Sequence, residues 1–458
     1  MDRIVLMLLY MFLLALTAGM TGCKKMVQLP DRDGQPNSGV YFANDQQAVD
    51  AINGLRVRTM QETGSFTNGA NTVFPGLSGD ELKPTGSAKY LEDFAGNRLS
   101  SDNTYVAAIY NTAYGIIANI NIVLQGLGGA SIPDALRARL QGECYCLRAL
   151  IYSRLAGLFG NVPLVTSTNV DVVARLPRSP VAAVYDQVLA DLLAADSLLP
   201  AEYVAGDKDV VARTSPDRWT ARGLLARIYL YLERWPQAER MATDVLGRDE
   251  LTLEHNPDSV FLSGSHEIMW QLLPASQGVN GEATYFLPAN GTRPAFAILP
   301  SLLNAFEPGD RRKTAWTATH SSGVVYPFKY KMRTGSEGKE CNVLLRLAEQ
   351  YLIRAEARAH EDELTGAIAD LNTVRQRAGL PVLKNNLSQQ EVLAAVAQER
   401  RIELMCEWGH RWIDIKRTGQ ADALMSVLKT AWKPTAALYP LPVGELKKDP
   451  FLIQNPGY

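Results

Sequence analysis

Two stretches decide the fold: "ARIYLYLERWPQAERMATDVL" (residues 226–246) and "AEARAHEDELTGAIADLNTVR" (residues 355–375). In each stretch, two runs with apolar residues at helical spacing flank a short polar break. Ala226 and Ala355 stand at equivalent places, each twelve residues before a second alanine. Such evenly spaced hairpins are typical of tetratricopeptide-like scaffolds, whose apolar faces are buried only when hairpins stack. The sequence therefore predicts an all-α fold built from stacked helical hairpins.

Further helical pairs are expected upstream, at about 105–127 with 134–159 and at 180–199. Two long regions, about 62–104 and 254–342, interrupt the helical pattern and are rich in Gly, Pro, Asn, Ser and Thr. Ordinary connections between elements are about 4–6 residues long, and much longer ones are commonly binding loops. We therefore expect both regions to be loop insertions that carry the function.

The amino-terminal stretch is apolar from Ile4 to Met20 and ends at Gly22 and Cys23. An apolar run that stops at a lone cysteine is similar to a bacterial lipoprotein signal. This pattern predicts a signal peptide (1–22), acylation of Cys23, a polar tether (23–45) and a single folded body (46–458). An uncleaved anchor helix with an incidental cysteine is the alternative.

Composition excludes several classes of function. The net charge of −2 provides no basic field for nucleic acid. The five cysteines form no CxxC pair and the five histidines no His-x-x-x-His motif, so we expect no metal site, no cofactor and no catalytic residue. Asp80, Glu81 and Glu282 are acidic residues in the long regions, and two such carboxylates across a cleft would suit a glycan hydrolase, which stays open as an alternative.

The most charged block is "ERRIELMCEWGHRWIDIKR" (399–417), in which Glu399, Glu403 and Glu407 recur every four residues. We expect it to form an ion-pair network between helices, with Trp408 and Trp412 in the core. Glu407 and His410 also have the Glu-x-x-His spacing of di-iron proteins, but such sites need a second motif of this kind, and none is found.

Several blocks in the same order carry a family resemblance: "RALIYSRLAGLFGNVPLV" (148–165), "RWTARGLLARIYLYLERWPQAERMATDVL" (218–246), "ERRIELMCEWGHRWIDIKRTG" (399–419) and "LYPLPVGELKKDPFLIQNPGY" (438–458). Together they resemble the SusD/RagB family of nutrient-binding outer-membrane lipoproteins of Bacteroidetes. The resemblance implies a helical body with four tetratricopeptide-like units. It also implies non-catalytic capture of an extracellular oligosaccharide at the cell surface and delivery to a SusC-like TonB-dependent barrel. Some relatives capture peptides, so oligopeptide capture is an alternative, and a lid that binds nothing tightly is another.

In that family the ligand site is an aromatic platform built from loops in these two parts of the chain. Aromatic faces stack on the C–H patches of sugar rings, and fixed polar groups bind the hydroxyls. The candidates here are Tyr90, Phe94, Asn97, Tyr285, Arg293 and Trp316. Trp316 stands in the polar stretch "RRKTAWTATHSSG" (311–323), so it is the aromatic least explained by packing. Trp270 and Tyr326 are expected to be core residues, and the alternative for every candidate aromatic is that it packs its loop onto the scaffold.

Overall fold

The computed structural model describes residues 42–61, 64–203, 213–274, 280–289, 291–334 and 339–458. The predicted signal peptide, Cys23 and most of the predicted tether lie outside these residues. The first helix, α2, begins at Asp45, where the Asn44 side chain accepts a hydrogen bond from the backbone N–H of Gln47. This is an ordinary N-cap, since an Asn oxygen satisfies one of the free amides of the first turn.

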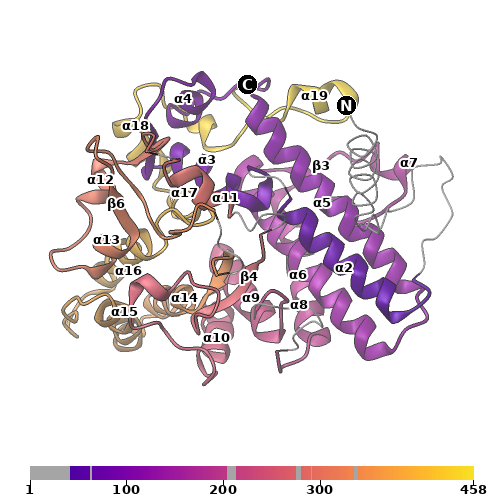
Figure 1. Cartoon of the computed structure of the whole chain (residues 1–458), viewed down its shortest axis with the longest axis horizontal. Helices are drawn as coiled ribbons and strands as arrows, with labels where there is room; N and C mark the ends of the chain where they lie inside the picture. Colours follow the sequence, from indigo (N-terminus) through magenta and orange to yellow (C-terminus); the bar gives the residue numbers. More distant parts are fainter. Residues whose placement is uncertain (1–41, 62–63, 204–212, 275–279, 290, 335–338) are drawn as a thin grey trace, which may run out of the picture.

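Long helices form the scaffold: α2 (Asp45–Thr59), α5 (Thr104–Gly128), α6 (Asp134–Phe159), α8 (Val181–Leu198), α9 (Arg218–Tyr231), α10 (Trp235–Leu246), α14 (Leu347–His360), α15 (Leu364–Arg377) and α16 (Gln389–Glu403). They pack in chain order, each against the next, as Figure 1 shows from α2 and α5 at one side of the molecule to α15 and α16 at the other. The expected pair at 105–127 and 134–159 is present as α5 and α6, whereas residues 180–199 form the single helix α8 rather than a pair. The all-α prediction is confirmed for the scaffold.

Residues 226–246 and 355–375 lie in the hairpins α9–α10 and α14–α15. They stack directly on each other through α10 and α14, although a long segment of chain separates them. At this contact the rings of Trp235 and His360 lie parallel, with centroids 3.9 Å apart and planes within 6°. Ala238 and Ala355 are fully buried, so the small side chains allow the helices to approach closely.

Sequence signals explain where these helices begin. The side chain of Asp217 accepts a hydrogen bond from the backbone N–H of Thr220 at the start of α9, and Ser388 and Glu391 form a second capping box at the start of α16. Pro236 occupies the first turn of α10, where a missing N–H costs nothing.

The remaining helices are short: α3 (Asn71–Ser78), α4 (Lys89–Ala95), α7 (Val170–Val173), α11 (Gly281–Phe286), α12 (Pro300–Leu303), α13 (Arg311–Trp316), α17 (His410–Arg417), α18 (Ala421–Leu428) and α19 (Val443–Lys448). The π-helical segment Phe66–Ala70 and the 3-10 segments Pro257–Ser259 and Pro434–Ala437 add single turns. Most of these pieces fall in the two regions expected to be irregular or near the carboxyl end, so the loops carry more local order than the sequence predicted.

The strands are two to five residues long and pair as antiparallel two-stranded ribbons. The pairs are β1 (Leu82–Pro84) with β5 (Phe296–Ile298), β2 (Val162–Pro163) with β3 (Arg178–Ser179), β4 (Ile268–Leu272) with β8 (Asn342–Arg346), and β6 (Thr317–Thr319) with β7 (Val325–Pro327). Trp270 on β4 and Tyr326 on β7 are both buried, as expected of core residues.

Helix α5 is the one helix in the described residues that is long and apolar enough to cross a membrane. It packs against α2 and α6, and Val106, Ile109, Ala113 and Ile117 are buried at helical spacing. This face belongs to the main hydrophobic core of the protein.

Candidate functional site

The two long regions of the sequence meet in space. Strand β1 of the first region pairs with β5 of the second, with Leu82 opposite Ile298. The ribbon continues at Thr85, whose backbone N–H donates to the carbonyl of Ala295 at 2.9 Å and whose hydroxyl donates to the carbonyl of Pro294. The segments on either side of this ribbon are therefore neighbours.

Beside this ribbon lies a group of three aromatic residues that we call the tyrosine cluster: Tyr90 on α4, Tyr105 in the first turn of α5 and Tyr285 on α11. The rings of Tyr90 and Tyr105 are stacked, with centroids 4.4 Å apart and planes within 15°. Tyr90 is 37% exposed, and the other two rings are half-buried. The cluster therefore presents an aromatic surface to solvent at the junction of the two regions.

The hydroxyl groups of the tyrosine cluster interact with one another. A hydrogen bond with Tyr90 raises the pKa of Tyr105 to about 12, with smaller contributions from burial and from Tyr285. Burial raises the pKa of Tyr285 to about 12, and Tyr90 adds to the effect. The phenols of Tyr105 and Tyr285 are thus neutral at physiological pH, so each of these two hydroxyls is able both to donate and to accept a hydrogen bond.

The backbone of residues 64–70 fixes the position of Tyr285. Gly64 and Gly69 have φ values of +86° and +101°, and a Cβ added at Gly69 would lie 3.0 Å from a ring carbon of Tyr285. The side chain of Asn68 accepts a hydrogen bond from the N–H of Gly281 at 2.8 Å, which ties the start of α11 to the same turn. Glycine is required at both positions because only it adopts this backbone and leaves room for the ring.

Phe94 is fully buried beneath the tyrosine cluster rather than exposed in it. Its ring lies 4.5 Å from that of Phe74, which in turn lies 5.1 Å from that of Tyr105. A ring without exposed surface cannot stack on a ligand in this structure, so Phe94 supports the cluster from below. The interpretation of Phe94 as a contact residue is corrected accordingly.

A cleft of about 320 Å³ adjoins α4, lined in part by Glu92, Gly96, Arg98 and Lys429. Asn97 lies between two of these lining residues, is itself 6% exposed and has a φ of +51°. Burial lowers the pKa of Lys429 to about 8. The cleft offers the charged groups of Glu92, Arg98 and Lys429 as partners for sugar hydroxyls.

Arg293 is exposed and immediately precedes Pro294, the residue that accepts the hydroxyl hydrogen bond of Thr85. It therefore lies at the rim of the β1–β5 ribbon, on the same junction as Tyr90 and Tyr285. The structure thus brings Tyr90, Tyr285 and Arg293 to one part of the surface. Asn97 is buried next to the cleft and does not line it, so its interpretation as a contact residue is corrected as well. Tyr105 was not among the predicted site residues, because the first long region was expected to end at residue 104, just before it.

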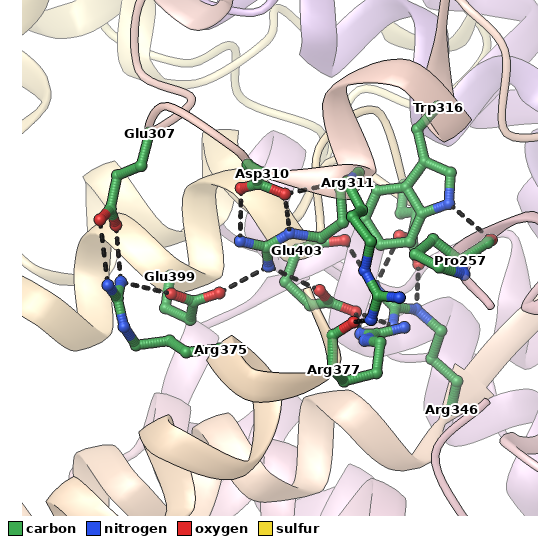
Figure 2. A network of polar contacts seen from close by, with 12 residues as sticks. Pro257, Glu307, Asp310, Arg311, Trp316, Arg346, Arg375, Arg377, Glu399 and Glu403 are labelled. Carbon is green, nitrogen blue, oxygen red and sulfur yellow. Dashed lines mark hydrogen bonds and ion pairs between the residues drawn. The ribbon is translucent and has the colours of Figure 1, made fainter. Parts of the chain in front are cut away.

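Trp316 was predicted to be the candidate aromatic least explained by packing. The residue is fully buried, so this prediction is wrong. Its indole N–H donates to the carbonyl of Pro257 at 2.9 Å, and its ring packs against Phe261 at 5.9 Å. Lys329 lies 4.2 Å and Arg377 5.6 Å from the ring centroid. Figure 2 shows the ring beside the side chains of Arg346 and Arg377, where it forms one wall of an ion-pair network.

That network joins carboxylates of the charged block to arginines from other parts of the chain (Figure 2). Arg312 binds Asp310 at 2.8 Å, Glu399 at 2.5 Å and Glu403 at 2.8 Å, and its side chain is 1% exposed. Arg346 binds Glu403 at 2.5 Å and also Glu267 and Glu407, each at 2.8 Å. Figure 2 also shows Arg377 at Glu403 and Arg375 reaching Glu307.

Burial opposes the ionisation of Glu403, but Arg377, Arg346 and Arg312 hold its pKa well below the usual value. Trp408 and Trp412 are buried, as expected. The prediction that this block is a structural network joining helices is confirmed.

The di-iron alternative does not fit the geometry. Glu407 is engaged by Lys329 and Arg346, and burial and nearby arginines lower the pKa of His410 well below its usual value. Helix α16 ends at Glu403, and α17 begins after Gly409, so Glu407 and His410 do not share one helix. Within the described ranges, no group of three or more metal-ligating side chains occurs.

The three acidic residues considered for a hydrolase are buried. Arg401 and Arg411 bind Asp80 at 2.9 and 2.8 Å. Burial raises the pKa of Glu81 to about 7 and that of Glu282 to about 8.

Each of these carboxyl groups has a protein partner. Glu81 accepts the backbone N–H of Cys406 at 2.7 Å, and Glu282 accepts the hydroxyl of Thr72. A pair of carboxylates facing a substrate across an open cleft is therefore not formed by these residues.

Comparison with known proteins gives family matches in two parts of the chain. Residues 307–458 match the model described as the SusD family, and residues 55–230 match one described as "Starch-binding associating with outer membrane". SusD-like protein P2 of Formosa agariphila is 26% identical, over 96% of this chain and 97% of that protein.

Solved structures agree with these matches. A SusD-like carbohydrate binding protein from Bacteroides vulgatus is 27% identical, with a TM-score of 0.72 over 83% of this chain and 84% of that one. A laminarin binding SusD-like protein is 23% identical, with a TM-score of 0.77 over 91% and 100% of the two chains, which shows the shared fold. These SusD-like structures have a helical tetratricopeptide-like fold. The order of the sequence blocks, the stacked hairpins and the matches at both ends of the body lead to one conclusion: the chain belongs to the SusD family.

Proposed function

We propose that the protein binds an extracellular oligosaccharide without cleaving it and passes it to a SusC-like TonB-dependent barrel. The observation that carries this proposal is the tyrosine cluster, where Tyr90 stacks on Tyr105 at the solvent-exposed junction of the two long regions. Flat aromatic faces favour sugar rings, and the adjoining cleft supplies Arg98 and Lys429 for hydroxyl groups. The related carbohydrate binding protein from Bacteroides vulgatus supports the same class of ligand.

The non-catalytic part of the proposal rests on the acidic residues of the two regions. Asp80, Glu81 and Glu282 are committed to partners inside the protein, so they are not available to protonate a glycosidic oxygen. The relatives are described as binding proteins, which supports the same reading.

The location follows from the family and from the amino-terminal sequence. We propose that the acyl chain on Cys23 anchors the protein in the outer membrane, with the folded body at the cell surface. The family description of association with the outer membrane supports this placement.

A direct binding panel tests the proposal. The purified folded body is titrated calorimetrically with β-glucan, α-glucan, xylan and mannan oligosaccharides and, in parallel, with a mixed oligopeptide library. We expect saturable heat with one glycan class and none with the peptides. Binding of the peptides alone would replace the proposal with oligopeptide capture, and release of reducing ends during incubation would replace it with hydrolysis.

The barrel partner has its own test. Affinity capture of the tagged protein from solubilised outer membranes should recover a TonB-dependent barrel in a defined stoichiometry. Failure to recover any barrel from membranes in which the protein is expressed would contradict the delivery step while leaving glycan binding intact.

A further inference from the structure

Two cationic side chains in the cleft that adjoins α4 have no acidic partner. Arg98 and Lys429 both line this cleft of about 320 Å³, which we call the α4 cleft. Within the described ranges, no carboxylate lies at ion-pair distance from either side chain. A cleft lined by uncompensated charge of one sign concentrates ligands of the opposite sign.

The ammonium group of Lys429 is held in place by neutral acceptors. It donates to the carbonyl of Leu77 at 3.0 Å and to that of Ala95 at 2.6 Å, in the last turns of α3 and α4. These bonds cap both helices, but they occupy only two of its three donors and bring no full negative charge. Burial lowers the pKa of Lys429 to about 8, so the group is mainly protonated at neutral pH.

The guanidinium of Arg98 lies at the same end of α4. A Cβ added at Gly96 would lie 3.0 Å from Nε and 3.3 Å from Cζ of Arg98. Gly96 directly follows Ala95, whose carbonyl binds Lys429, and both residues line the α4 cleft. The missing side chain at Gly96 therefore lets the guanidinium approach the backbone and brings both cations to one end of the cleft.

The acidic residues nearby do not balance these two cations. Glu92 is the one acidic residue among those that line the cleft, which leaves one positive charge in excess. Asp80 also acts on Lys429, but Arg401 and Arg411 already bind it at 2.9 and 2.8 Å. The carboxylate of Asp80 is therefore committed to these two arginines.

Exposed charges around the cleft leave the excess in place. Lys89 pairs with Asp93 at 2.8 Å and adds no net charge. Of the remaining exposed groups, Asp102 is acidic and lies near Lys89, and Lys83 is basic and precedes the lining residue Pro84. These two opposite charges offset each other.

We propose that the α4 cleft is an anion subsite of the glycan site, in which a carboxylate or sulfate group on the bound oligosaccharide pairs with Arg98 and Lys429. The inference rests on the proposed function, because the cleft and the tyrosine cluster share α4. Tyr90 stands two positions before Glu92 and so lies on a different side of this helix. A helix is about 10–12 Å across with its side chains, so a glycan of several sugars reaches both sides.

The chemistry of the cleft suits an acidic sugar better than a neutral sugar or an inorganic ion. Guanidinium and ammonium groups bind oxyanions through charge-assisted hydrogen bonds, which are about twice as strong as neutral ones. A neutral hydroxyl would leave the excess charge of Arg98 and Lys429 uncompensated. Glu92 is an acceptor in the same cleft, and a sugar hydroxyl supplies the donor that a simple anion lacks.

Matched acidic and neutral oligosaccharides test this preference. Glucuronoxylan oligosaccharides, and β-glucan, α-glucan and mannan oligosaccharides oxidised to carboxylates at the primary hydroxyl, are titrated into the purified protein beside their methyl esters. Sulfated forms of the same backbones are compared with their unsulfated parents. On the backbone that binds, the anionic form should bind about tenfold tighter than its neutral counterpart. The pair that shows the preference identifies the group as carboxylate or sulfate.

Arg98→Gln locates the preference in the cleft. Arg98 is exposed, so the variant should fold, and the preference should fall to about threefold because only Lys429 remains. Arg240→Gln is the matched control, since Arg240 is exposed on α10, which Figure 1 shows on the opposite side of the molecule from α4. It should keep the parental preference.

The outcomes separate the subsite from the proposed function. Equal affinity for the anionic and neutral forms of a backbone that binds would overturn the anion subsite and leave glycan binding intact. A parental preference in Arg98→Gln would overturn the subsite as well. Absence of binding by every oligosaccharide would contradict the proposed function itself, and the subsite would be rejected with it.

Discussion

Tyr90 stacks on Tyr105 with ring centroids 4.4 Å apart and planes within 15°, and this pair joins the first long region to the start of the longest apolar helix. Asn103 orders the pair, because its side chain accepts the backbone N–H groups of Tyr105 and Val106 at 3.0 and 3.2 Å. Tyr105 is thus held by the helix, and the more exposed Tyr90 offers its outer face to a ligand.

Tyr90→Ala should weaken binding of the glycan identified in the panel by about 1–3 kcal/mol, the usual loss for an aromatic anchor in a recognition site. The melting temperature should stay close to that of the parent, because the side chain is already 37% exposed. Titration calorimetry and a thermal melt of the same preparation measure both quantities.

Phe451→Ala is the matched control for this prediction, since Phe451 is 52% exposed near the carboxyl end and belongs to neither long region. It should bind the glycan as the parent does. Parental affinity in Tyr90→Ala would move the ligand site away from the tyrosine cluster.

Trp316→Ala should lower the free energy of unfolding by about 3–5 kcal/mol, the usual loss for a large buried aromatic. The substitution removes the hydrogen bond to Pro257 and exposes one wall of the ion-pair network to a cavity. Denaturant unfolding monitored by circular dichroism measures the change. A stable variant with impaired glycan binding would restore Trp316 as a ligand residue.

Glu403→Ala should destabilise the protein by about 3–5 kcal/mol, because it leaves Arg312, Arg346 and Arg377 buried with one acceptor fewer. Glu445→Ala is the control, since its partner Lys448 has a 73% exposed side chain and such a surface ion pair contributes about 0–1 kcal/mol. Chemical denaturation of both variants measures the difference. Equal, small losses in the two variants would show that the network does not stabilise the fold.

The stacked hairpins were predictable because helical periodicity is local, and the alanine spacing repeats in the sequence itself. The junction of the loops was not predictable in detail, since the pairing of Leu82 with Ile298 depends on contacts between distant segments. Trp316 was misassigned as a ligand residue for a related reason. Its neighbour Arg312 has the hydropathy of a surface residue, but ion pairs with Asp310, Glu399 and Glu403 allow Arg312 to be buried.

Glu282→Gln should flatten the dependence of stability on pH. Burial raises the pKa of Glu282 from 4.5 to about 8 in the folded protein. Between these two values the folded chain retains a proton that the unfolded chain has lost, so the contribution of Glu282 to stability falls as pH rises through this window. Glutamine stays neutral and should remove that fall, an effect on the order of a few kcal/mol.

This prediction is tested by measuring the free energy of unfolding at pH 5 and at pH 8. The measurement is made on the parent, on Glu282→Gln and on the exposed control Glu202→Gln. The parent and Glu202→Gln should lose stability together, and Glu282→Gln should lose less. An unchanged slope in Glu282→Gln would mean that Glu282 is ionised inside the protein at neutral pH.

Cys23→Ser should release the protein from the outer membrane. The prediction rests on the apolar run that ends at Gly22 and Cys23 and on the polar stretch that follows. A thioether to a diacylglycerol needs the cysteine sulfur, and serine has the same size without it, so the variant should lose its anchor and keep its fold. Membrane fractionation and metabolic labelling with a fatty acid measure the two effects, with Cys341→Ser as the control because Cys341 is a buried cysteine of the folded body. Labelled, membrane-bound protein in the Cys23→Ser variant would assign the anchor to the apolar run itself.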